Sequence, residues 1–143
     1  AWLQGFSDQT FIQSSPEVAN EAQGNVVRRK ANVHGFKRDL AAAKGVICNT
    51  GFELISECLQ WKKPVLTRPL AKQMEQLSNA AALEQLGYAT TMQSLETKTA
   101  RAWFDAMPEA PDVHFKNVAS ALAEWLARGA SKPVAELSRQ LWS

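Results

Sequence analysis

Short apolar segments and segments of helical spacing alternate along the first two thirds of the chain. The apolar and β-branched runs, each bounded by glycine, proline or serine, predict strands. These runs lie at residues 11–13, 25–29, 45–49, 64–67 and 88–92. Helical spacing predicts helices between them, at residues 37–44, 52–61 and 72–86. From residue 94 onward the pattern predicts helices alone, at residues 94–107, 113–128 and 133–142.

This alternation predicts the fold class. Strands separated by helices pair in parallel, because the crossover between parallel strands is long enough to hold a helix. The run at residues 45–49 is compact and apolar, which is typical of a strand covered on both faces. We therefore expect an α/β protein with a Rossmann-like parallel sheet, flanking helices and a helical C-terminal third. Residues 1–143 are interpreted as a single domain, with 93–143 as its helical C-terminal segment.

Composition narrows the class of protein. The chain is 45% hydrophobic and 21% charged with a net charge of +2, which is typical of a globular domain and too balanced to indicate a nucleic-acid partner. No stretch has the length and apolarity of a transmembrane segment. Cys48 and Cys58 form no C-x-x-C pair, which favours free thiols and a cytoplasmic location. The chain starts at Ala1 without methionine or a signal peptide, so we expect it to be trimmed from a longer protein.

Ligands of open parallel sheets bind at the carboxyl ends of the strands. Two loops qualify, at residues 49–52 and 68–72. In the first, Thr50-Gly51-Phe52 joins a strand directly to a helix, whose first N–H groups and dipole favour an anion. Gly51 would let a phosphate approach the backbone, and the carboxylate of Glu57 could accept hydrogen bonds from a ribose diol. The alternative is that Gly51 makes a tight turn and Glu57 is a surface acid.

The second loop leads into a helix that carries Glu75-Gln76 near its start. A carboxylate beside a carboxamide offers both acceptors and donors to vicinal sugar hydroxyls. Taken alone, this pair would be read as ordinary surface residues of a first helical turn.

Together, the two loops resemble the donor-binding core of GT-B glycosyltransferases over residues 48–87. The family pattern is a small residue with glycine, an acid six residues later, Lys-Pro-x-Leu-x-x-Pro, an acidic or amide residue followed by Gln, then Asn-Ala and Leu-Gly. This chain carries Thr50-Gly51, Glu57, Lys63-Pro64-Val65-Leu66, Pro69, Glu75-Gln76, Asn79-Ala80 and Leu86-Gly87. It is most similar to the bacterial branch that includes the N-acetylglucosaminyl transferase of lipid II synthesis, with a C-terminal domain of the glycosyltransferase family 28 type.

The resemblance implies one half of a GT-B fold, truncated at its N-terminus, that binds a nucleotide sugar, usually a UDP-sugar. The backbone at Thr50, Gly51 and Phe52 would hold the diphosphate, and Glu57 would bind the ribose hydroxyls. An N-terminal domain outside this chain would bind the acceptor and carry the catalytic base. The parent enzyme could associate peripherally with a membrane.

The resemblance also assigns the two ends of the donor. Glu75 and Gln76 would bind hydroxyls of the donor sugar. The uracil edge would be read at the predicted loop His34-Gly35-Phe36.

Two features bear on these assignments. Relatives commonly place Ser or Thr two or three residues after the glycine, where this chain has Glu53 and Leu54, and an acid there would repel a diphosphate. His34 and His114 are the histidines of the chain, and His114 is expected to play a structural role in a helical region.

No metal-ligand cluster or Asp-x-Asp pair is seen in the sequence, so no metal cofactor is expected. A nucleotide-sugar 2-epimerase and a binding module that has lost catalysis remain the alternatives.

Overall fold

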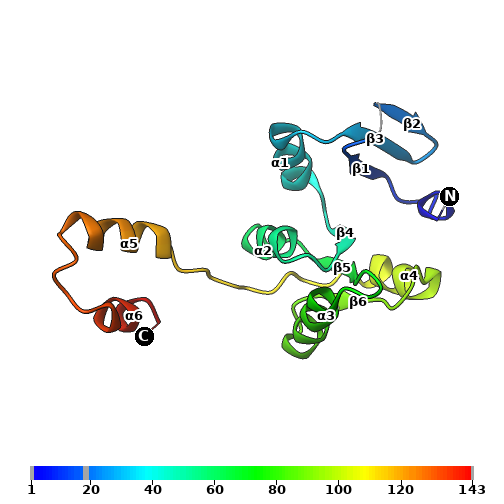
Figure 1. The fold of residues 1–143 in the computed structure, drawn as a ribbon. Helices are drawn as coiled ribbons and strands as arrows, with labels where there is room; N and C mark the ends of the chain where they lie inside the picture. Colours follow the sequence, from blue (N-terminus) through cyan, green and yellow to red (C-terminus); the bar gives the residue numbers. More distant parts are fainter. Residues whose placement is uncertain (1, 18–19, 143) are drawn as a thin grey trace. The chain divides into compact units, whose positions relative to one another are not determined.

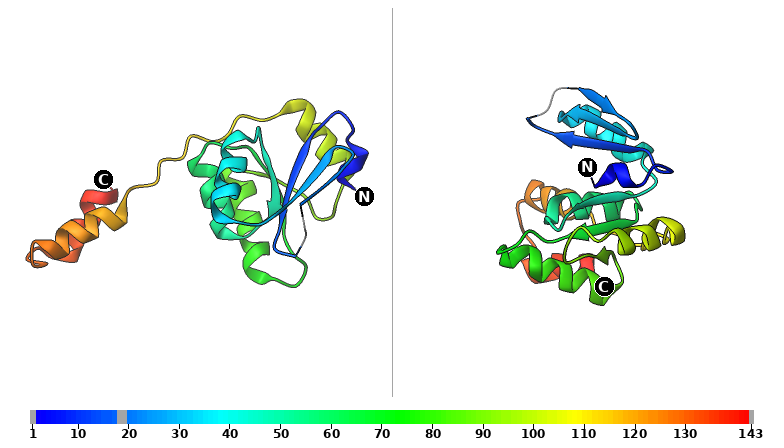
Figure 2. Two further views of the ribbon diagram at one scale, coloured as in Figure 1. Left: turned by 90° about the horizontal axis from the view of Figure 1, so that it is seen from above. Right: turned by 90° about the vertical axis from the view of Figure 1, so that its right-hand side faces the viewer.

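The structure is a computed structural model that describes residues 2–17 and 20–142. The chain forms two compact units, Ala1–Val113 and His114–Ser143. Figures 1 and 2 show the strands gathered in the first unit, while the second consists of helices. No helix within the described ranges combines the length and the apolarity that crossing a bilayer requires.

The first unit opens with a short 3-10 helix, η1 (Leu3–Gly5), followed by a mixed three-stranded sheet. Strand β1 (Phe11–Ser15) pairs in parallel with β3 (Val26–Lys30), and β2 (Glu21–Gln23) pairs with β3 antiparallel. The predicted strands at residues 11–13 and 25–29 are therefore confirmed. The hairpin strand β2 was not predicted, because its Glu-Ala-Gln sequence lacks the β-branched and aromatic residues that mark strands.

The second sheet is parallel throughout, in the order β4-β5-β6. Strands β4 (Val46–Asn49), β5 (Val65–Arg68) and β6 (Thr90–Thr91) alternate with the helices α2 (Phe52–Gln60) and α3 (Met74–Leu86). Ile47 pairs with Leu66 and Cys48 with Thr67, so the ends of β4 and β5 lie side by side. The α/β fold with a parallel sheet is confirmed, as expected for a Rossmann-like half of a GT-B fold.

Successive residues of β4 and β5 face opposite sides of this sheet, and each side is covered. Val65 packs in a buried cluster with Leu40, Ile55, Cys58, Leu59 and Leu83, which come from α1 (Val33–Ala42), α2 and α3. Its neighbour Leu66 packs in a second cluster with Phe6, Met92, Ala100 and Trp103, the last two from α4 (Thr97–Ala106). Val46 and Cys48 lie against the first cluster and Ile47 against the second. The strand at 45–49 is covered on both faces, as its continuous apolar run predicts.

The second unit is a pair of helices, α5 (Val118–Ala127) and α6 (Val134–Trp142). The indole Nε1 of Trp125 donates a hydrogen bond of 2.7 Å to the carbonyl of Lys132 in the connection. The helical C-terminal third is thus confirmed, but α5 begins at Val118 and not at residue 113. Asn117 caps this helix by accepting a hydrogen bond of 3.0 Å from the N–H of Ser120. His114 precedes the helix, so its predicted helical placement was wrong.

Candidate functional site

The turn from β4 to α2 carries the predicted anion site. Gly51 is the N-cap of α2, with φ −75° and ψ 136°, and its carbonyl accepts a hydrogen bond of 3.3 Å from the N–H of Ile55. Within residues 2–17 and 20–142, the N–H groups of residues 51–54 donate to no other protein group. These are the four donors that every helix leaves unsatisfied at its start. Phe52 is 68% exposed and Glu53 is exposed as well, so the turn is open to solvent.

Thr50 fixes this turn from inside the protein. Its side chain is completely buried, and its Oγ1 lies 3.0 Å from Oγ1 of Thr67 at the end of β5. The Thr67 hydroxyl donates to the carbonyl of Cys48 at 3.0 Å. A hydroxyl has one proton. The proton between the two threonines therefore belongs to Thr50, and the side chain of Thr50 is directed into the protein.

The loop after β5 is held by the first turns of α3. Gln76 Oε1 accepts a hydrogen bond of 3.0 Å from the N–H of Leu70, and its Nε2 donates to Oε1 of Gln73 at 2.8 Å. One turn later, Asn79 Nδ2 donates to the carbonyl of Thr50 at 3.2 Å. Helix α3 therefore bonds to both predicted ligand loops and keeps them at the same edge of the sheet. Glu75 is exposed in the first turn of α3.

A cavity of about 360 Å³ lies between α1 and α2. Its lining residues are Ala31, Asn32, Val33, Phe36, Lys37 and Glu57. The structure thus brings together two residues that were predicted to contact the same nucleotide, Phe36 and Glu57, although they are far apart in sequence. A cavity of this volume is within the range of small-molecule sites.

The predicted loop at His34-Gly35-Phe36 is the first turn of α1, so its assignment as a loop was wrong. Helix α1 begins at Val33 because Asn32 caps it, with Oδ1 accepting a hydrogen bond of 2.7 Å from the N–H of Gly35. Phe36 lines the cavity between α1 and α2, while His34 is exposed and does not belong to its lining. Asn32 and Lys37 are lining residues that were not predicted, although asparagine is a preferred N-cap residue and marks the start of this helix.

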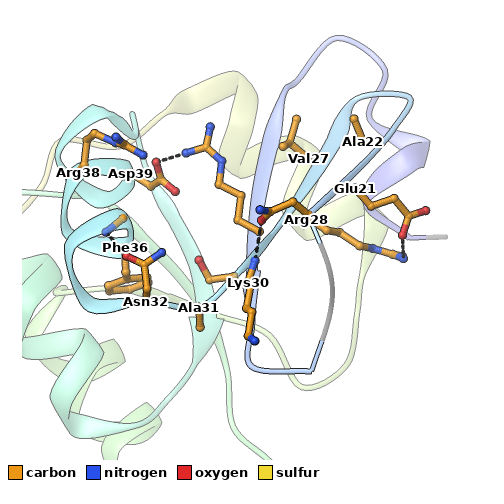
Figure 3. Close-up of a pocket in the computed structure, with 14 residues that line it drawn as sticks. Glu21, Ala22, Val27, Arg28, Lys30, Ala31, Asn32, Phe36, Arg38 and Asp39 are labelled. Carbon is orange, nitrogen blue, oxygen red and sulfur yellow. Dashed lines mark hydrogen bonds and ion pairs between the residues drawn. The ribbon is translucent and has the colours of Figure 1, made fainter.

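A second cavity, of about 740 Å³, lies between α1 and the β1-β3-β2 sheet. Its lining includes the cations Arg28, Arg29, Lys30 and Arg38 together with Glu21 and Asp39. Figure 3 shows the Arg28 side chain directed toward Glu21. The Nη1 atom of Arg28 lies 3.7 Å from Oε2 of Glu21. Arg29 pairs with Asp39 across the cavity. Two of the four cations are thus paired with acids that line the same cavity.

Cys48 on β4 and Cys58 on α2 belong to the lining of neither cavity. Burial raises the pKa of the Cys48 thiol to about 11, and burial with the nearby Cys48 raises that of Cys58 to about 12. Both thiols are free. They are small core residues, as their apolar sequence context indicates.

The sequence pattern of glycosyl transferase family 1 matches residues 3–108, which include both sheets, both ligand loops and both cavities. The chain belongs to glycosyl transferase family 1. This membership supports the predicted GT-B glycosyltransferase domain and, with it, glycosyl transfer as the chemistry that the domain serves. No curated protein and no solved structure is significantly similar to the chain.

The region that matches the family ends shortly after α4, so the α5–α6 unit lies outside the matched region. The family assignment therefore concerns the sheet-containing unit. Among residues 2–17 and 20–142, no group of three or more His, Cys, Asp and Glu side chains is arranged as a metal site.

Proposed function

We propose that this domain binds the donor of a glycosyl transfer reaction, a nucleotide sugar of the UDP-sugar class. The base and ribose would occupy the cavity of about 360 Å³, with the Glu57 carboxylate accepting hydrogen bonds from the ribose hydroxyls. The observation that carries this proposal is that Phe36 and Glu57 line one cavity beside α2. A carboxylate within a small-molecule cavity is suited to a diol, because both hydroxyls can donate to it.

The diphosphate would lie at the N-terminus of α2, at the open turn of Gly51 and Phe52. Phe52 and Glu57 are five positions apart on the helix, which corresponds to a rise of about 7–8 Å along its axis. That spacing suits a ligand whose ribose and phosphates are adjacent groups. The donor sugar would then extend toward Glu75 and Gln76 at the start of α3. We propose that this binding uses no metal cofactor, since the free N–H groups and the dipole at the start of α2 favour an anion there.

For the parent protein, we propose transfer of the sugar to an acceptor held by a separate domain that also supplies the catalytic base. The resemblance to the lipid II branch supports this separation of donor and acceptor binding between two domains. A cytoplasmic location with peripheral membrane association belongs to the same proposal. The 143-residue chain is then expected to show no transferase activity by itself. Turnover of a UDP-sugar by the isolated chain with an added acceptor would contradict this.

Titration calorimetry with UDP tests the binding proposal directly. Glu57→Gln keeps the shape of the side chain but removes its charge, so the affinity should fall about tenfold or more, since charge-assisted hydrogen bonds contribute about 1.5–3 kcal/mol each. Glu109→Gln, an exposed acid outside both cavities, is the matched control and should bind as the wild type does. Equal affinities for the two variants would show that Glu57 does not bind the ribose.

One observation favours the alternative of a binding module with a weakened diphosphate grip. Glu53 is exposed in the first turn of α2, where its charge opposes that of a diphosphate. The first hydroxyl along α2 is that of Ser56, one turn after Phe52; it donates to the carbonyl of Phe52 at 2.8 Å and is thereby engaged. Glu53→Ser should strengthen UDP binding severalfold if the repulsion operates. Weaker binding by this variant would identify Glu53 as a ligand contact.

A further inference from the structure

Helix α3 presents two carboxamides that each hold a different loop of the site. Gln76 and Asn79 are three residues apart, so their side chains are neighbours on the helix surface. Gln76 holds the loop after β5 through the N–H of Leu70, and Asn79 holds the turn after β4 through the carbonyl of Thr50. The family resemblance assigns Gln76 to the donor sugar, but it assigns no role to Asn79.

The bond from Asn79 has a geometrical consequence for the next residue. The carbonyl of Thr50 and the N–H of Gly51 belong to one peptide group, which is planar and trans, so they point in opposite directions. When Asn79 draws the carbonyl toward α3, the Gly51 N–H is directed away from α3. Within the described residues this N–H donates to no protein acceptor. It therefore remains available to a ligand at the start of α2.

The protein offers few other restraints on this peptide group. Gly51 has no side chain, and apart from its two chain neighbours no residue has an atom within 4 Å of the position that a Cβ would occupy. The buried Thr50–Thr67 hydroxyl bond holds the side chain of Thr50, but not the orientation of the carbonyl that follows. The hydrogen bond from Asn79 Nδ2 to that carbonyl, at 3.2 Å, is the contact that sets it.

We propose that Asn79 is a positioning residue that orients the Thr50–Gly51 peptide group so that the Gly51 N–H points at the phosphates of the donor. This inference rests on the proposed function, because it concerns the diphosphate site at α2. It assigns Asn79 to the protein side of that site, acting through the backbone of the turn. Loss of the bond should affect ligands with phosphates and spare those without.

The first test compares UDP with uridine by calorimetry. Asn79→Leu removes the donor, and Asn79→Asp replaces it by an acceptor of nearly the same shape that repels the carbonyl. Both should weaken UDP about tenfold, which corresponds to about 1.4 kcal/mol, and leave uridine binding unchanged. Ser78→Ala, an exposed neighbour on the same helix, is the control and should change neither affinity. Equal losses for UDP and uridine, or no loss for UDP, would overturn the proposal.

The second test needs no ligand and separates this inference from the proposed function. ¹⁵N relaxation of the Gly51 amide should show a well-ordered peptide group in the wild type and a lower order parameter in Asn79→Leu and Asn79→Asp. If the wild type binds no UDP, the proposed function fails, whereas the order parameter still decides whether Asn79 restrains the turn. An unchanged order parameter in both variants would refute the positioning role.

Discussion

Replacing Thr67 by valine should destabilise the Ala1–Val113 unit by about 2–3 kcal/mol, although the two side chains have nearly the same shape. The Thr67 hydroxyl is fully buried. It accepts a hydrogen bond from the Thr50 hydroxyl and donates one to the carbonyl of Cys48. Valine would leave both the Thr50 hydroxyl and the Cys48 carbonyl without this partner. A buried polar group that loses its partner costs about 1–3 kcal/mol, so two such losses justify the magnitude.

The direction of the protons predicts an asymmetry between the two threonines. Thr50→Val removes one donor, but Thr67 keeps its bond to Cys48, so the expected cost is about 1 kcal/mol. In the double variant the Thr50 hydroxyl that Thr67→Val would orphan is absent. The double variant should therefore be less destabilised than the sum of the single variants, by about 1 kcal/mol, as is common for groups in one hydrogen-bond network.

Urea unfolding of the four proteins, followed by circular dichroism and by tryptophan fluorescence, measures these free energies. Coincident transitions and an unchanged m-value are required for the comparison. Additive destabilisation would show that the two hydroxyls do not interact. A larger cost for Thr50→Val than for Thr67→Val would reverse the assignment of the proton between the two hydroxyls.

Three further predictions follow from the same unit. Gly45→Ala should destabilise it by about 1–3 kcal/mol, since the added Cβ would lie 2.6 Å from the Trp103 ring, and urea unfolding will measure this. Cys48, whose pKa burial raises from 9.0 to about 11, should react with Ellman's reagent at pH 8 about a hundredfold more slowly than an exposed thiol, because only the thiolate reacts; a rate that matches the urea-unfolded chain would contradict this. Gly51→Ala should change the free energy of unfolding by less than about 0.5 kcal/mol but weaken UDP severalfold, and calorimetry beside urea unfolding separates the two effects.

The β4–α2–β5–α3 region is the part of the fold that the sequence predicts best. Its strands are covered on both faces, so their apolar runs are continuous and bounded by the residues that end them. The helix at residues 52–61 is observed as Phe52–Gln60, and the one at 72–86 as Met74–Leu86, with Gly87 as its C-cap. The local sequence pattern and the tertiary packing favour the same helices and strands in this region.

Elsewhere, the deciding contacts are not visible in the sequence pattern. The start of α1 was misplaced because His34 and Gly35 were interpreted as a loop, whereas the Asn32 cap begins the helix before them. Lys63 follows α2 in the sequence, where a cation would be expected to bond to the end of that helix. Its Nζ instead donates to the carbonyls of Ala41 and Ala43, at 2.7 and 2.8 Å, and thereby satisfies the end of α1.

The candidate site, like the fold, could be predicted only in part. The rule for parallel sheets placed the two predicted ligand loops at one edge, because the strands before them are neighbours in the sheet. The bonds that join the loops depend on the register that sets Cys48 opposite Thr67 and on the helical turn that brings Asn79 to Thr50. Neither can be derived from composition or periodicity, which is why Asn79 was recognised as part of a motif but not given a role.

Gly51 differs from Gly45 and Gly87 of the same unit, because the fold accounts for those two glycines and not for Gly51. Gly87 has φ +67°, a backbone conformation that side chains rarely adopt, and Gly45 faces the ring of Trp103, so the fold itself accounts for both. Gly51 has φ −75° and ψ 136°, which any residue adopts, and open space where its Cβ would lie. Neither backbone conformation nor packing within the described chain requires a glycine there. A ligand that approaches the backbone at the start of α2 would supply that requirement, which is the place that the proposed diphosphate occupies.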